Sequence, residues 1–339
     1  MELSPVDIVI FAPLAVVFGV LLFWFLQLLF IESQKYLLSK IRAKHEPLCR
    51  FTNFIGILFQ TICHALGYTV TRSGISHFSV NIHYGHVKPK KEKRGIFEWI
   101  SNSFLFLGPF FIPSAVLLTS VYFFTGRSFF IPSPAADAFY TFSEQFIAFG
   151  TALHQFSVKF FNFLFTIDLF DPRHIGFILL LVFLGMGIRP SYIGEEKKKK
   201  VDMIYDLKNI QAHITSSPLY VALLFLLAYI FYYISLLLHG NWYVALFSIF
   251  GWISIIAIVS LLVAHFLILL IKITDTLPKW WALLPYSMLP LSYILIRIVF
   301  YFLPIENILF FSLLFMICIS ALTILILVKY KTNTFKTKT

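Results

Sequence analysis

Four histidines that lie between positions 64 and 86 have the clearest capacity for metal chemistry in this sequence. They are His64, His77, His83 and His86, in a chain with ten histidines in all. Neutral imidazole is the commonest metal ligand in proteins, and a catalytic zinc ion takes three protein ligands and a water molecule. A non-standard zinc site could be assembled from His64, His83, His86 and Glu195, with His77 as a further ligand. The sequence favours the other interpretation, a polar strand face at a membrane surface that holds no metal.

The segment from His64 to Tyr68 has the length and the first residue of the zinc-binding helix motif HExxH. In that motif two histidines four residues apart share one helix face, and the glutamate activates the metal-bound water. Here the glutamate position is Ala65 and the second histidine position is Tyr68. Loss of the base removes about 10²–10⁴-fold of rate enhancement, and loss of one imidazole leaves too few zinc ligands. We therefore expect no metal cofactor and no enzyme activity, with zinc-dependent proteolysis as the alternative.

Several segments must position these residues if they act together. An apolar stretch at 51–70 predicts a helix that carries His64 near its end. Apolar and polar residues alternate over 77–84, which predicts a β-strand. The pair Gly108-Pro109 opens the next apolar span, and Pro190-Ser191 follows the span after that one.

This order of segments resembles the integral-membrane zinc metallopeptidases of the site-2 protease family, over residues 50 to 200. The resemblance implies that the helix at 51–70 crosses the membrane and that the β segment is cytoplasmic. It places His64 at the first zinc-ligand position, with Ala65 and Tyr68 as departures from the family motif. A degenerate member, or pseudoprotease, is implied. Such a protein would bind transmembrane segments of other membrane proteins, as a chaperone, a regulator or a subunit of a membrane complex.

Composition excludes a soluble protein and a disordered one. Of 339 residues, 59% are hydrophobic and only 13% are charged, against about 25% charged in an ordinary globular chain. A transmembrane helix needs about 20 apolar residues. We therefore predict an all-α polytopic membrane protein with about eight transmembrane helices and a short membrane-associated β segment. The predicted spans are 8–31, 51–70, 104–124, 175–188, 219–238, 243–271, 281–303 and 308–328.

The basic residues predict the orientation of the chain. The net charge is +11, and lysine and arginine cluster at 88–94, at 197–200 and in the tail from Lys329. By the positive-inside rule these loops and the C-terminus are cytoplasmic, in the plasma membrane of a prokaryote. The basic segment 32–50 conflicts with this orientation if 51–70 crosses fully. The basic clusters fit anionic lipid headgroups, and an acidic partner such as the ribosome or translocon is the alternative; DNA is not expected.

The spacing of phenylalanines over 137–165 predicts an amphipathic helix with one aromatic stripe. A full crossing there would place the 197–200 lysines outside, so we expect an interfacial or packed helix on the outer side. The predicted organisation has three regions. They are an N-terminal transmembrane helix with a basic amphipathic linker at 1–50, a metallopeptidase-like membrane core at 51–200, and a C-terminal four-helix membrane region with a basic tail at 201–339.

Arg297 is a charged residue inside a predicted span. Intramembrane charges mark functional sites by default, yet arginine can also reach the interface, and Glu306 is available as an ion-pair partner. Structural pairing is the favoured interpretation. The alternative is a channel or transporter, which requires a polar cavity at mid-membrane among the last four spans. The shortage of paired intramembrane carboxylates disfavours that alternative.

Overall fold

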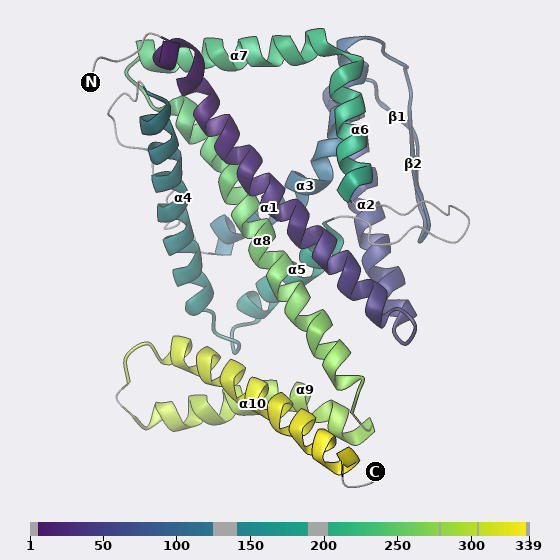
Figure 1. The fold of residues 1–339 in the computed structure, drawn as a ribbon, viewed down its shortest axis with the longest axis vertical. Helices are drawn as coiled ribbons and strands as arrows, with labels where there is room; N and C mark the ends of the chain where they lie inside the picture. The colour runs from purple at the N-terminus through teal and green to yellow at the C-terminus, as the bar shows by residue number, and fades with distance from the viewer. Residues whose placement is uncertain (1–5, 125–140, 189–202, 278, 304, 337–339) are drawn as a thin grey trace. The chain divides into compact units, whose positions relative to one another are not determined.

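The computed structural model describes residues 6–124, 141–188, 203–277, 279–303 and 305–336 (Figure 1). This part of the chain is almost entirely helical, and its β structure is one two-stranded sheet. Six of its helices are long and apolar enough to cross a membrane. The prediction of an all-α, multi-pass membrane protein is therefore confirmed. Pro190, Ser191 and Glu195 lie outside the described residues, as does the start of the predicted helix at 137–165.

The described residues form one π-helix, ten α-helices and two strands. They are the π-helix η1 (Asp7–Phe11), α1 (Ala12–Ile41), α2 (Glu46–Val70), β1 (Ile75–Val80), β2 (Gly85–Pro89), α3 (Ile96–Phe124), α4 (Phe142–Phe165), α5 (Pro172–Gly187), α6 (Met203–Ser216), α7 (Pro218–Leu237), α8 (Trp242–Thr274), α9 (Lys279–Tyr301) and α10 (Ile308–Lys336). Proline stands in the first turn of α2, α5 and α7. A proline there loses no hydrogen bond, because the first N–H groups of a helix have no partner within it.

Two of the eight predicted spans are not among the six candidate helices. The stretch at 175–188 belongs to α5, which has 16 residues and is shorter than the roughly 20 that a crossing needs. The stretch at 51–70 belongs to α2, whose polar side chains include Gln60 and His64. The other six predicted spans correspond to the six candidate helices, with η1 and α1 forming one continuous candidate over Asp7–Ile41.

The chain divides into two compact units. The first unit comprises Met1–Val158 and Phe177–Ala264, and the second comprises Lys159–Gly176 and His265–Thr339. The boundary falls inside α4, α5 and α8, so each unit is discontinuous in sequence. Each unit is described below by itself.

Helix α8 is the most buried of the six candidate helices: 61% of the residues in its most apolar stretch are buried. Its Trp252 stacks on Phe156 of α4 at 5.3 Å between ring centroids, and the indole N–H donates to the carbonyl of Ala152. Ser260 donates to the carbonyl of Leu181 on α5. Because this indole and this hydroxyl donate to the backbone of neighbouring helices, both buried donors are paired and they fix the register of α8.

The aromatic stripe predicted for the helix at 137–165 is buried in α4. Phe149, Leu153, Phe156 and Phe160 are each less than 5% exposed. Ile147, by contrast, is 66% exposed. The helix is therefore amphipathic, and its aromatic face is the packed one.

Helix α1 begins with a backbone defect that α7 and α8 repair. Pro13 has no N–H, so the carbonyl of Val9, four residues earlier, lacks its α-helical donor. The hydroxyl of Tyr233 donates to that carbonyl at 3.0 Å, and Tyr229 donates to the carbonyl of Ile10 at 2.7 Å. Tyr243 of α8 donates to the carbonyl of Pro13 at 2.6 Å. Tyr229 and Tyr233 thus attach α7, which runs crosswise to α1 (Figure 1), to the start of that helix, and Tyr243 attaches α8 there.

A buried ion pair joins α1 to α6. The ammonium of Lys35 lies 3.8 Å from the carboxylate of Asp206, and the two side chains are 9% and 3% exposed. Glu32 lies 3.9 Å from the same ammonium and is 38% exposed. Two charges removed from water in this way stabilise each other, so removing either member is expected to destabilise the fold.

His213 of α6 lies in an aromatic setting against α3. Its ring stacks on Trp99 at 5.0 Å, and its Nε2 lies 2.9 Å from the hydroxyl of Ser103. Burial lowers the pKa of His213 below its ordinary value of 6.5, because burial disfavours the charged imidazolium.

We expect the first unit to lose stability in mild acid through His213. A lowered pKa means that the folded chain binds fewer protons than the unfolded one, so this contribution is complete above pH 6.5 and is lost as the pH falls below it. The measurement is the thermal midpoint of the purified protein between pH 5 and 8. In His213→Gln the decline below pH 6.5 should be smaller, whereas His83→Gln, in an exposed turn, should follow the wild type. Equal declines in all three proteins would contradict the assignment.

The second unit is built on the antiparallel pair of α9 and α10. Trp281 near the start of α9 stacks on Tyr330 near the end of α10 at 5.4 Å, and Phe300 contacts Phe315 at 6.0 Å. Phe165, at the end of α4, packs edge-on against Phe310 at 5.2 Å. The loop between α4 and α5 also belongs to this unit, and it carries the polar residues that meet Arg297.

Candidate functional site

His64 lies in the last part of α2, where the sequence predicted it. Its ring is half-buried and lies 4.5 Å from the ring of Tyr68, one turn further along the same helix face. The Nε2 atom of His64 is buried and has no hydrogen-bond partner in the part of the chain that the structure describes. The position that would hold a second imidazole in an HExxH helix is therefore occupied by a phenol in ring contact with His64.

Helix α3 packs closely on α2 beside His64. A Cβ atom on Gly108 would lie 2.8 Å from the Cβ of Cys63, and one on Gly67 would lie 2.8 Å from the carbonyl oxygen of Ser101. Both glycines are thus needed for the two backbones to approach. The hydroxyl of Thr71 lies 3.0 Å from that of Ser101, and both hydroxyls donate to the carbonyl of Gly67, at 2.9 and 3.3 Å.

The prediction that Gly108-Pro109 opens the third span is wrong in its position. Helix α3 begins at Ile96, so the pair lies in the middle of the helix, and Pro113 follows one turn later. Membrane helices tolerate such prolines when neighbouring groups satisfy the freed backbone. Pro109 and Pro113 free the carbonyls of Leu105 and Pro109. Next to them, the fully buried Gln27 of α1 donates from its amide to the carbonyl of Phe110 at 2.8 Å, which ties α1 to this part of α3.

The hairpin packs on the other side of α2. Gly85 meets Thr61 so closely that a Cβ atom there would collide with the threonine hydroxyl, and Asn53 donates from its amide to the carbonyl of Ile82 at 3.1 Å. In the hairpin, Phe78 pairs with Val87 and Ser79 pairs with His86. The three segments expected around His64 therefore lie together.

A single strand through 77–84 was predicted, and the structure forms a hairpin instead. Strand β1 ends at Val80, and the N–H of Asn81 donates to the carbonyl of Tyr84 at 2.8 Å, which closes a turn. His83 is consequently an exposed turn residue. The apolar and polar alternation continues through the turn, so periodicity alone does not reveal where the strand ends.

The predicted ligand set does not converge. His77 and His86 lie near each other, with ring centroids 5.9 Å apart across the hairpin. Within the described ranges, however, no three histidine, cysteine, aspartate or glutamate side chains are grouped so that they could hold a metal ion. Glu195 lies outside those ranges.

Arg297 forms an ion pair with Asp168, which no local sequence pattern indicates as its partner. One amino group of Arg297 lies 3.2 Å from a carboxylate oxygen of Asp168, in the loop between α4 and α5. The ion-pair partner is therefore Asp168 and not Glu306, the partner that the sequence predicted. The other oxygen of Asp168 accepts from the hydroxyl of Tyr293 and from the N–H of Phe170, both at 3.0 Å.

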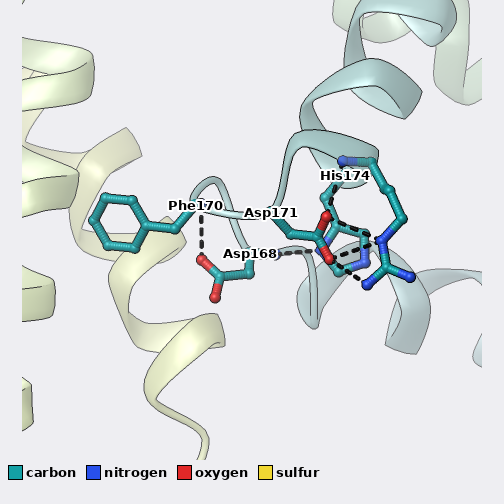
Figure 2. Close-up of polar contacts among 5 residues, drawn as sticks. Asp168, Phe170, Asp171 and His174 are labelled. Carbon is teal, nitrogen blue, oxygen red and sulfur yellow. Dashed lines mark hydrogen bonds and ion pairs between the residues drawn. The ribbon is translucent and has the colours of Figure 1, made fainter.

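The same loop holds a second ion pair. Asp171 and Arg173 form a side-chain pair at 2.7 Å, and hydrogen bonds from Arg173 lower the pKa of the Asp171 carboxyl to about 2. His174 accepts at Nδ1 from the N–H of Asp168 at 3.0 Å, so its Nδ1 carries no proton in this arrangement. Figure 2 shows Asp168 and Asp171 pointing to opposite sides of the loop. In the sequence, the only sign of this cluster is that the charged residues Asp168, Asp171 and Arg173 lie close together between two phenylalanine-rich segments.

A pocket of about 300 Å³ adjoins Arg297. It is lined by Phe170, Arg297, Ile298, Tyr301, Phe302 and Ile308. The lining is mostly apolar, with a single cation, and so it differs from the polar cavity that a channel or transporter requires. No family model, no curated protein and no solved structure matches the chain.

Proposed function

We propose that this chain is a multi-pass membrane protein of the site-2 protease type that has lost the metallopeptidase chemistry. It binds segments of other membrane proteins and acts as a chaperone, a regulator or a subunit of a membrane complex. The observation that carries this proposal is the packing of the hairpin and of the Gly108 region of α3 on the helix that bears His64. An architecture kept around a broken motif fits binding better than hydrolysis.

The hairpin supplies the binding surface in this proposal. Ile75 and Phe78 of β1 are 41% and 46% exposed. The sheet has two strands in the described chain, so β1 pairs with β2 alone there. A free strand edge presents unpaired backbone N–H and C=O groups, and an extended segment of a partner can pair with it. The partner's apolar side chains would then contact Phe78.

The departures from the motif support binding without hydrolysis. Ala65 has no group that could act as a base, and Tyr68 stands where the second imidazole would be. We propose eight membrane crossings, which are the six candidate helices together with α2 and α5. Because of the basic tail, the C-terminus is cytoplasmic in this proposal, and the membrane is the plasma membrane of a prokaryote. Lipid headgroups, or an acidic partner, would meet the basic clusters.

Site-specific photo-crosslinking tests the binding surface. A benzoylphenylalanine in place of Phe78, in the full chain in its own membranes, is expected to give discrete adducts with other membrane polypeptides. The matched control is the same group in place of Phe123, which is 76% exposed on α3 away from the hairpin. Equal adduct patterns at the two positions, or none at Phe78, would contradict the proposal.

Metal analysis of the purified protein tests the loss of hydrolytic chemistry separately. We expect no stoichiometric zinc, and no change in metal content in His64→Ala. Stoichiometric zinc that disappears in His64→Ala would reject the degenerate interpretation and favour an active protease with a non-standard ligand set.

A further inference from the structure

We propose that the pocket beside Arg297 binds the phosphate of a membrane phospholipid, with the acyl chains lying along the apolar wall of α9 and α10. This site lies in the second unit and is independent of the function proposed above. The guanidinium of Arg297 would hold the phosphate. The apolar lining residues Ile298, Phe302 and Ile308 would contact the chains.

Arg297 has hydrogen-bonding capacity left for a ligand. A guanidinium carries five N–H donors in a planar fork, and Asp168 engages one amino group. No second acceptor contacts Arg297 among the residues that the structure describes. The side chain is 23% exposed, lines the pocket, and lies 5.7 Å over the ring of Phe170. An arginine held in this way matches the geometry of a phosphate oxygen pair.

The nearby carboxylates are compensated, so they do not close the site to an anion. Asp168 accepts from Tyr293, Phe170 and Arg297, which leaves its charge spread over three donors. Asp171 is paired with Arg173 on the far side of the loop. A carboxylate with several donors is a weaker competitor for the remaining N–H groups of Arg297 than a free one.

The position and lining of the pocket favour a lipid over a free anion. Arg297 lies about one turn before the end of α9 at Tyr301, and tyrosine at a helix end is typical of the headgroup level of a bilayer. Tyr301 and Phe302 are 82% and 77% exposed. Such a wall offers a free phosphate ion no solvation, whereas it suits a headgroup joined to hydrocarbon chains.

The test is native mass spectrometry of the delipidated full-length protein in mild detergent. Three probes are added in turn: phosphatidylglycerol, diacylglycerol with the same chains, and inorganic phosphate. We expect one phosphatidylglycerol to bind preferentially. Diacylglycerol loses the charge-assisted hydrogen bond and inorganic phosphate loses the apolar contacts of the chains, so each should bind at least about tenfold more weakly.

Three variants locate the site. The double variant Asp168→Asn/Arg297→Gln keeps a neutral hydrogen bond in place of the ion pair, and it should bind phosphatidylglycerol at least about tenfold more weakly. Ile298→Trp fills the pocket without touching the ion pair and should have the same effect. Leu295→Trp is the matched control, because Leu295 and Ile298 are both 53% exposed on α9, and it should bind as the wild type does.

Any of three results would overturn the proposal. The first is equal binding of diacylglycerol and phosphatidylglycerol by the wild type, which would mean that the phosphate is not recognised. The second is binding of inorganic phosphate as strong as that of the lipid. The third is unchanged phosphatidylglycerol binding in both the double variant and Ile298→Trp. Thermal midpoints close to that of the wild type confirm that each variant is folded.

Discussion

Replacing Lys35 with methionine is expected to lower the free energy of unfolding by about 3–5 kcal/mol, the usual cost of leaving one member of a buried ion pair without its partner. Asp206 is 2% exposed, so its carboxylate would be left in the protein interior between α1 and α6. Glu32 would lose the same ammonium, which lies 3.9 Å from its carboxylate. Unfolding in mild detergent, by denaturant titration, measures the change.

Two comparisons separate the ion pair from the loss of a lysine. Lys40→Met, on the same helix at an exposed position where the ammonium lies 5.0 Å over the ring of Tyr36, should change stability little. The double variant Lys35→Met/Asp206→Leu should recover most of the loss, because no buried charge remains. A double variant as unstable as Lys35→Met would show that packing, and not charge, accounts for the effect.

The second large effect is expected at the contact between α2 and α3. Gly67→Leu forces a side chain toward the backbone of Ser101, where a Cβ atom alone would lie 2.8 Å from the carbonyl oxygen. Backbone cannot move aside as a flexible side chain does, so we expect a loss of about 1–3 kcal/mol in stability. The carbonyl of residue 67, which accepts from the hydroxyls of Thr71 and Ser101, remains in this variant, but it would move with the displaced helix.

Gly150→Leu is the control for Gly67→Leu. Gly150 lies inside α4, and no atom lies within 4 Å of the place where its Cβ would be. Leucine is the better helix former by about 0.8 kcal/mol, so this variant should be as stable as the wild type or slightly more so. Comparable losses in both variants would contradict the close contact between α2 and α3. Thermal unfolding of the two variants side by side decides the matter.

The helices and the packed face of α4 could be predicted from sequence because each depends on local pattern. A long apolar stretch must be helical in a membrane, and the regular spacing of Phe149, Leu153 and Phe156 marks one helix face. Six of the eight predicted spans correspond to candidate helices, whereas α5 is apolar but only 16 residues long and α2 carries polar side chains. The position of Gly108-Pro109 was also wrong, because α3 extends into the polar residues before it.

The candidate site was predictable only where its contacts are close in sequence. His64 and Tyr68 are four residues apart on a helix, so their contact follows from helix geometry. Asp168 and Arg297 are 129 residues apart, and no local pattern joins them. Arg297 could be recognised as an unusual intramembrane charge, whereas its partner depends on how the α4–α5 loop meets α9 within the second unit.

Because Pro13 has no N–H, only certain helices could replace α7 at the start of α1. Helix α7 is the least buried of the six candidates, at 11%. Its apolar surface contacts lipid as favourably as protein, so that surface does not fix its position in a bilayer. Departure would strip the carbonyl of Val9 of the Tyr233 hydroxyl that serves it, and a bare carbonyl costs several kcal/mol in hydrocarbon. A purely aliphatic competitor therefore cannot substitute for α7; only a helix that brings its own hydroxyl donors can.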